Sequence, residues 1–315
     1  MRGARAAVIL ASALLAGAQQ PTIRTKVPLV VLSTSVTDRQ GHPIAGLNAP
    51  DFLVLDEGRP RAVRVDTVAD GLAPVALVAL VQTTAMSLSA LAKIRKVGAM
   101  VPGAVVGANG EAAVVTFDDE IKVVQDFTAN ADPIEDAFKQ LQPQDSSGGR
   151  MIDAVDEALR LLAGRSGARR AYILIIGESK DRGSKEKLSD LLPKLQASGV
   201  TVYSLTYSAY LTPFTTRPED YQSTGGSLPV VEFARLFKQN TVEALTEATG
   251  GRRFGFQTKS KLENDLIALG GDLHSRYLLS FTPSPEGNPG FHSLRVEIRN
   301  HPEAVVHTRP GYFAY

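Results

Sequence analysis

Side chains that could carry out catalysis are few in this sequence and follow no catalytic motif. The zinc-protease pattern HExxH, the serine-nucleophile pattern GxSxG and the phosphate-binding P-loop do not occur. The chain has no cysteine, which excludes disulfides, cysteine-ligated zinc, iron–sulfur clusters, a thiol nucleophile and a lipid-modified cysteine. Histidine, the commonest general acid and base, occurs five times, mainly in predicted strands and turns: His42, His274, His292, His301 and His307.

Two groups of acidic residues have the spacing of paired carboxylates, which can act together as general acid and base. Asp118 and Asp119 fall in the turn of a predicted hairpin. Asp153, Asp156 and Glu157 lie opposite the apolar face of a predicted helix. We therefore expect both groups at the solvated surface.

The overall charge and composition are those of an ordinary globular protein. The 315 residues include 34 Lys and Arg and 33 Asp and Glu, for a net charge of +1, and 43% are hydrophobic. This near-balance offers no electrostatic argument for binding nucleic acid or an anionic membrane. The apolar content suffices for a sizeable core.

The first residues have the pattern of a signal peptide. Arg2 and Arg5 precede the apolar run Ala6–Leu15, and the small residues Ala16–Ala18 follow. The run is shorter than the ~20 residues that span a bilayer. We predict a signal peptide over Met1–Ala18, cleaved near Ala18, and an exported (periplasmic or extracellular) mature protein. The alternative is a buried N-terminal helix.

Both ends of the chain contain short alternating segments typical of strands, separated by turns. Neither end has enough strands to close a core alone. We predict a small β-sandwich built from residues 19–70 and 276–315, with residues 71–275 inserted as a second unit. The predicted strands are Val30–Val36, Asp51–Leu55, Ala62–Val68, Tyr277–Phe281, Ser293–Ile298 and Ala304–Thr308.

Strands and helices alternate in the middle of the chain, which predicts an α/β unit with a mostly parallel sheet and helices on both faces. Ligands of such sheets bind at the carboxyl ends of the strands. Residues Tyr210–Pro229 have the composition of a long surface loop. The predicted strands are Val75–Val81, Ala112–Phe117, Ile121–Phe127, Tyr172–Ile176, Val200–Thr206 and Arg252–Phe256, and the helices are Leu88–Val101, Met151–Leu162, Ser184–Ala197, Thr241–Thr249 and Lys261–His274.

Seven short signatures occur in order across the mature chain, which resembles VWFA-related bacterial (acidobacterial-type) exported proteins. Each signature is weak, but their order is specific for the family, though not for an activity. The resemblance implies a Rossmann-like von Willebrand factor A domain beside the sandwich. The signatures are Val36–Gly41, Gly46-Leu47 with Asp51-Phe52, Phe117-Asp118 with Asp126–Thr128, Gly148-Gly149 with Asp153-Ala154, Asp181 with Gly183-Ser184, Ala248–Arg252 and Arg309–Tyr312.

The resemblance also implies a metal-ion-dependent adhesion site on three loops at the carboxyl edge of the sheet, where hard oxygen ligands hold Mg²⁺. The family pattern places its five ligand positions on Gln82, Thr84, Met86 (with Ser87 beside it), Arg150 and Glu178. One carboxylate and one hydroxyl remain, and a guanidinium repels a cation. We therefore expect a degenerate site with no metal and no other cofactor.

Two interpretations of Arg150 follow from the resemblance. In the first, Arg150 and Glu178 form an internal ion pair that closes an inactive site. In the second, Arg150 replaces the metal and offers a bidentate fork to a carboxylate of the ligand, while Glu178 and Gln82 orient it.

By resemblance, the expected function is non-catalytic binding of an unidentified protein, with no nucleic-acid partner and no membrane insertion of the mature chain. The oligomeric state stays open. The expected ligand-binding residues are Gln82, Thr84, Ser87, Arg150 and Glu178.

Two alternatives stay open. One is Mg²⁺- or Mn²⁺-dependent adhesion through unorthodox ligands, namely Thr84, Ser87, Glu178 and Asp118. The other is an enzyme that uses the strand ends of the Rossmann-like sheet, which would need a cleft with convergent titratable groups.

Overall fold

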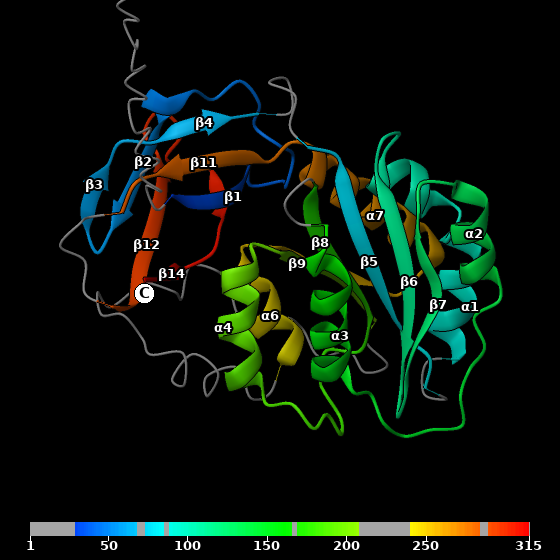
Figure 1. The fold of residues 1–315 in the computed structure, drawn as a ribbon. Coiled ribbons are helices and arrows are strands. Elements are labelled where there is room, and N and C mark those ends of the chain that lie inside the picture. Colours follow the sequence, from blue (N-terminus) through cyan, green and yellow to red (C-terminus); the bar gives the residue numbers. More distant parts are fainter. Residues whose placement is uncertain are drawn as a thin grey trace, which may run out of the picture.

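A computed structural model describes residues 29–67, 73–84, 88–165, 169–207, 240–283 and 289–314. Figure 1 shows a small β-sandwich, built of blue and red strands from both ends of the chain, beside a larger α/β unit. The predicted signal peptide Met1–Ala18, the predicted loop Tyr210–Pro229 and Ser87 lie outside the described residues. Within the described residues, no helix is long and apolar enough to cross a membrane.

A six-stranded sheet forms the centre of the α/β unit, in the order β10-β9-β8-β5-β6-β7. Neighbouring strands are parallel except β7, which pairs with β6 antiparallel through a short hairpin. β5 is buried along its whole length because both of its faces are covered, as its continuous apolar run predicts. The strands are β5 (Val75–Gln82), β6 (Glu111–Phe117), β7 (Ile121–Thr128), β8 (Arg170–Gly177), β9 (Thr201–Tyr207) and β10 (Arg253–Phe256).

Helices cover both faces of this sheet, which confirms the predicted fold class. α1, α2 and α7 pack on one face and α3, α4 and α6 on the other, each set with its own hydrophobic cluster. The helices are α1 (Leu88–Val97), α2 (Ala131–Lys139), α3 (Met151–Ala163), α4 (Leu188–Ser198), α6 (Thr241–Thr249) and α7 (Lys259–His274).

Three helices differ from the sequence-based expectation. α1 ends at Val97 rather than at Val101, and a π-helical turn with Pro102 near its start follows over Val101–Val106. Proline lacks the N–H that would continue the helix. α4 begins four residues later than expected, at Leu188. α2 is not among the predicted elements, although the cap at Asn130 and two buried residues four positions apart mark it.

The sandwich consists of two four-stranded sheets, in the orders β13-β1-β11-β4 and β14-β12-β2-β3. Each sheet combines strands from both ends of the chain, and one hydrophobic cluster joins them, including Leu32, Val54 and Leu279. The predicted sandwich is thus confirmed, while the predicted boundary residues stay predictions. Its elements are β1 (Val30–Thr37), a 3-10 turn (Ala49–Asp51), β2 (Phe52–Asp56), β3 (Arg59–Arg61), β4 (Arg64–Asp66), β11 (Tyr277–Phe281), β12 (Gly290–Ile298), β13 (Val305–His307) and β14 (Gly311–Ala314).

A buried charged cluster joins the two units. Arg276 is 2% exposed and donates from Nη1 to Asp272 (3.2 Å) and the Tyr203 hydroxyl (2.7 Å). It also donates from Nε to the Ser33 hydroxyl on β1 (2.8 Å), and Asp272 accepts from Arg252 as well (2.9 Å). Burial raises the pKa of Asp272, but the charges of Arg276 and Arg252 outweigh it and hold that pKa below its usual value. We call Asp272, Arg276, Arg252 and Tyr203 the junction cluster.

Candidate functional site at the carboxyl edge of the central sheet

Three loops meet where β5 and β8 end, because the carboxyl ends of parallel strands lie at the same edge of a sheet. Gly149 and Arg182 exchange two backbone hydrogen bonds of 2.9 Å, which join the second loop to the third. Gln144 donates from its backbone N–H to the Thr83 carbonyl (2.6 Å), which joins the second loop to the end of β5. We call residues 82–84, 145–150 and 178–187 the loop face.

Gln82, the last residue of β5, is fully buried and connects the first and third loops. Its Oε1 accepts from the Glu178 N–H (2.7 Å), and its Nε2 donates to Thr84 Oγ1 (3.3 Å) and Glu178 Oε2 (3.5 Å). A Cβ at Gly177 would lie 2.7 Å from Gln82 Oε1, so the close approach requires glycine. Gln82 thus contacts Glu178, a contact that the sequence did not predict. Because Gln82 and Thr84 are both fully buried, they support the loops from within.

Arg150 lies at the start of α3, and its guanidinium binds Asp153 rather than Glu178. It donates to Asp153 Oδ2 from Nε (2.8 Å) and Nη2 (2.5 Å), and to the Asp119 carbonyl from Nη1 (3.1 Å). The predicted pair with Glu178 is therefore wrong. The first turn of α3 places Asp153 three residues beyond Arg150, where side chains on a helix meet. Asp153 occupies the bidentate side of the guanidinium, which corrects the expectation that this fork is open to a ligand.

Asp153 is buried, so its expected place at the solvated surface is also wrong. Besides Arg150, it accepts from the backbone N–H groups of Lys185 (3.0 Å) and Glu186 (2.9 Å). Burial raises its pKa, but these two N–H groups and Arg150 outweigh burial and leave the pKa below its usual value. A carboxylate with these donors holds the third loop against α3.

The remaining acidic candidates range from buried to exposed. Asp118 is buried and accepts from the Thr83 hydroxyl (2.8 Å) and the Glu120 N–H (2.9 Å), again contrary to the surface expectation. Asp119 is exposed in the β6–β7 turn, as expected. Asp156 and Glu157 are half-buried on α3, and both form ion pairs with Arg160.

Glu178, the carboxylate that the resemblance assigns to the third loop, forms an ion pair with Arg182. Asp181 in the same loop accepts from the Ile152 N–H (3.0 Å) and the Ser184 hydroxyl (2.6 Å). The reasoning from sequence overlooked Asp153 and Asp181 as the residues that fix this loop. Their presence in two of the family signatures was the available signal.

The residues of this edge do not fit a divalent cation. Three carboxylates near it already bind a donor: Asp118 binds Thr83, Asp153 binds Arg150, and Glu178 binds Arg182. Among the described residues, no group of three or more His, Cys, Asp or Glu side chains is arranged to hold a metal. The Arg150 guanidinium adds a positive charge that a bound cation would have to oppose.

A pocket of about 380 Å³ lies beside the first loop, between β7 and the end of α2. It holds one carboxylate, on Asp118, and one amine, on Lys122, which binds Glu120 (2.7 Å). The five histidines lie elsewhere, in the sandwich and at the end of α7. This pocket therefore lacks the convergent acid–base pair that the enzyme alternative requires.

Three lysines form the outer surface of the third loop. Lys180, Lys185 and Lys187 are exposed, and none forms an ion pair with a carboxylate in the described part of the chain. The sequence expectation did not include them. Because the loop beneath them is fixed by Asp153 and Asp181, these charges project from a rigid support.

The family described as "VWA domain containing CoxE-like protein" matches residues 74–223, which begin just before β5. The α/β unit of the chain is therefore a von Willebrand factor A (VWA)-type domain. The match agrees with the parallel sheet, the helices on both faces and the position of the three loops. No curated protein matches the VWA chain.

Solved structures with similar folds include other VWA proteins. The von Willebrand factor type A protein from Catenulispora acidiphila has 11% identity and a TM-score of 0.46, covering 88% of this chain and 72% of that one. The conserved hypothetical protein BatB from Bacteroides thetaiotaomicron has 10% identity and a TM-score of 0.45, covering 62% and 96%. The vWF domain of the pilus tip protein Mfa5 from Porphyromonas gingivalis has 12% identity and a TM-score of 0.40, covering 62% and 94%.

Proposed function

We propose that this VWA protein is exported and binds another protein, without catalysis and without a metal, through its loop face. One observation carries the proposal: Asp118, Asp153 and Glu178, which could ligate a metal or transfer a proton, already bind donors within the loops. What remains accessible is a rigid surface with three exposed lysines. Such a surface suits recognition of a partner by charge and shape.

Arg150 takes the place of the metal in this proposal by holding loops together. Its guanidinium joins the β6–β7 turn, through Asp119, to α3, through Asp153. Asp153 in turn holds the amides of Lys185 and Glu186. The Arg150 guanidinium thus links three segments of the chain. In this proposal the partner contacts the lysines of the third loop rather than a bound metal.

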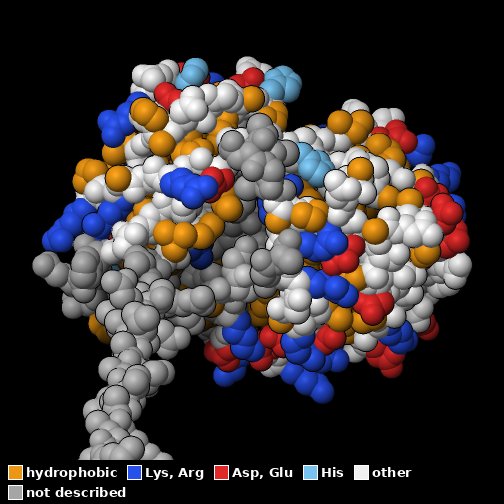
Figure 2. All heavy atoms as spheres, turned by 45° about the horizontal axis from the view of Figure 1, so that its top comes forward, with side chains coloured by type: hydrophobic (Ala, Val, Ile, Leu, Met, Phe, Trp, Pro, Cys, Tyr) orange, Lys and Arg blue, Asp and Glu red, His pale blue; other side chains and the backbone are white. Residues whose placement is uncertain are grey.

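The lysines define the chemistry of the partner, which presents carboxylates to the loop face. On the face that Figure 2 shows, basic and acidic side chains are interspersed. A local excess of positive charge on one loop favours an acidic protein surface and speeds association with it.

A charge-reversal experiment tests the proposal. The variant Lys180→Glu, Lys185→Glu, Lys187→Glu and the wild type are used to capture partners from the exported fraction. The triple variant is expected to lose its partner, with binding at least about tenfold weaker. The matched control reverses three lysines away from the loop face, Lys96, Lys139 and Lys259, and is expected to retain binding. Equal capture by both variants would contradict a role for the loop face.

A further inference from the structure

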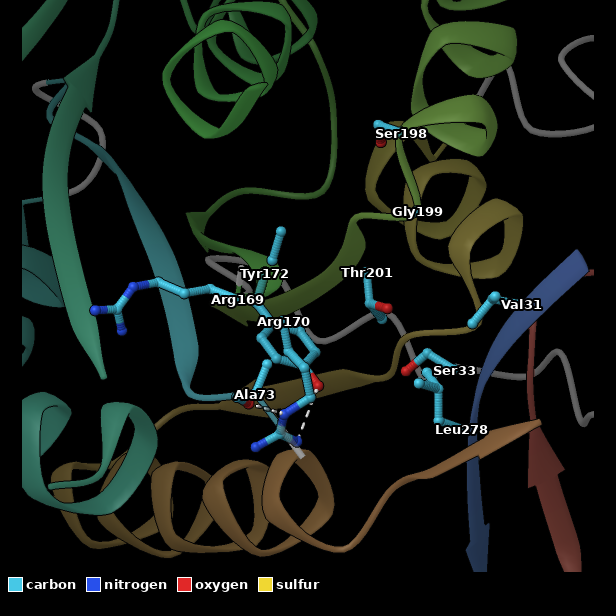
Figure 3. A pocket seen from close by; sticks show the side chains of 11 residues that line it. Val31, Ser33, Ala73, Arg169, Arg170, Tyr172, Ser198, Gly199, Thr201 and Leu278 are labelled. Carbon is cyan, nitrogen blue, oxygen red and sulfur yellow. Dashed lines mark hydrogen bonds between the residues drawn. The ribbon is translucent and has the colours of Figure 1, made fainter. Parts of the chain in front are cut away.

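A second pocket lies at the opposite end of the central sheet, between the VWA unit and the sandwich. Its volume is about 290 Å³, close to the lower end for pockets that hold small molecules. Arg170, Tyr172 and Thr201 line it from β8 and β9, and Val31 and Leu278 line it from the sandwich. In Figure 3 Arg170 and Tyr172 lie on one side of the pocket and the sandwich residues on the other, with Thr201 between them.

The described residues of the lining supply hydrogen-bond donors, and none of them is a carboxylate. Arg170 donates to three neutral oxygens: the carbonyls of Ala73 (2.8 Å) and Leu273 (3.0 Å) and the Tyr172 hydroxyl (3.5 Å). Among the described residues it forms no ion pair, so no described carboxylate offsets its positive charge. Arg169, also in the lining, already binds Glu111 (3.4 Å).

The effect of the Arg170 charge reaches its surroundings. The pKa of His274 is lowered by burial and, next, by the charge of Arg170. The charge of Arg170 therefore acts on a neighbouring group at the end of α7.

Three hydroxyl groups in the lining have a proton to donate. Thr201 is only 2% exposed, and its hydroxyl forms no hydrogen bond with the described part of the chain. The Tyr172 hydroxyl accepts from Arg170, and the Ser33 hydroxyl accepts from Arg276 (2.8 Å), but neither donates to a described group. These hydroxyls can therefore donate to an oxygen of a ligand in the pocket.

We propose that this junction pocket binds a small organic carboxylate. The carboxylate oxygens accept from Arg170 and from the hydroxyls of Tyr172 and Thr201, since a cation and neutral donors together favour an anion. A short hydrocarbon group lies against Val31, Ala73 and Leu278. Because the lining comes from both units, the bound carboxylate joins them. This proposal is independent of the proposed function of the loop face.

Thr201 provides a test that leaves the fold unperturbed. Since no described group pairs with its hydroxyl, Thr201→Val is expected to fold as the wild type does. Thr201→Ser keeps the hydroxyl and serves as the matched control. Sodium butyrate is titrated into each protein at constant ionic strength, with sodium chloride as the reference, and the melting temperature and the heat of binding are measured.

The wild type and Thr201→Ser are expected to show a saturable rise in melting temperature with butyrate. Thr201→Val is expected to bind about 10- to 100-fold more weakly, as for a lost hydrogen bond to a charged group. Equal binding by all three proteins, or no saturable binding by the wild type, would overturn the proposal. Inorganic phosphate is titrated in parallel, and binding of phosphate without butyrate would overturn the assignment to carboxylates.

Discussion

An arginine–aspartate pair lies near each end of strand β8, and the two pairs have different roles. At the carboxyl end of the strand, Arg150 and Asp153 pair on the loop face, with side chains 23% and 11% exposed. Beyond its amino end, Arg276 and Asp272 pair in the junction cluster, with side chains 2% and 0% exposed. Water reaches the first pair and can replace part of it, whereas the second pair has only protein partners. An arginine–aspartate pair thus shapes a surface at one end and holds two units together at the other.

The largest effect is expected from Asp272→Asn in the junction cluster. The change leaves Arg276 and Arg252 buried without their carboxylate, and breaking a buried pair in this way costs about 3–5 kcal/mol of unfolding free energy. Chemical denaturation measures the loss. The double variant Asp272→Asn, Arg276→Met removes one of the unpaired charges and is expected to recover part of the lost unfolding free energy. A loss below about 1 kcal/mol for Asp272→Asn would remove the contrast between the two regions.

The next largest effect is a pH dependence of the unfolding free energy that arises from His307 beside the junction cluster. Burial, and then the charge of Arg252, lowers the pKa of His307 to about 4 in the folded protein, from 6.5. The unfolded chain therefore binds a proton that the folded chain does not between those values, and stability falls as the pH drops from 6.5 to 4. The loss is up to about 3 kcal/mol.

Denaturation at a series of pH values, for the wild type and His307→Gln, isolates this contribution. Arg252, Arg276 and Asp272 face His307 in both proteins, and His274, whose pKa is also lowered, is unchanged. The loop-face carboxylate Asp153 loses its contribution only at lower pH, as the pH falls through its own lowered pKa. The same slope in His307→Gln would assign the dependence to another group.

A smaller and local effect is expected from Asp153→Asn on the loop face. Asparagine keeps one acceptor oxygen but loses the charge that binds Arg150, so we expect a loss of about 1–3 kcal/mol. Hydrogen exchange should accelerate at the amides of Lys185 and Glu186, which Asp153 holds. Asp156→Asn, three residues along α3, is the control and should leave both amides protected.

Divalent cations are expected to have no effect on the melting temperature. Mg²⁺ or Mn²⁺ should not change the melting temperature, because Asp118, Asp153 and Glu178 already bind donors and Arg150 adds a positive charge. A rise that saturates with metal and disappears in Glu178→Gln would instead support the metal-dependent alternative.

The fold could be predicted from the sequence to a large extent, because hydrophobic periodicity is a local property. The continuous run Val75–Val81 indicated a strand covered on both faces, and β5 is that strand. The alternating segments at both ends indicated a shared sandwich, and β1 pairs with both β11 and β13. The predictions were wrong at helix ends. The apolar repeat predicted a helix up to Val101, but α1 ends at Val97 and a π-helical turn with Pro102 near its start follows.

The candidate site was only partly predictable. The sequence placed Gln82, Arg150 and Glu178 at one edge of the sheet, where Gln82 and Glu178 are in contact. It did not indicate that Arg150 would choose Asp153, or that Asp118 would be buried beneath Thr83. Those choices depend on distances of a few ångströms between loops that are far apart in the chain.

By itself, then, the sequence determined the layers of this VWA protein, the meeting of its two ends in one sandwich and the lack of a catalytic motif. Only the tertiary structure decided which cation binds which carboxylate, that Thr201 and Arg170 share a pocket between the units, and which lysines remain outside. The physical reason is the distance along the chain between the residues that interact. Periodicity is set by neighbours along the chain, whereas ion pairing and burial are set by whatever the folded chain brings within about 4 Å.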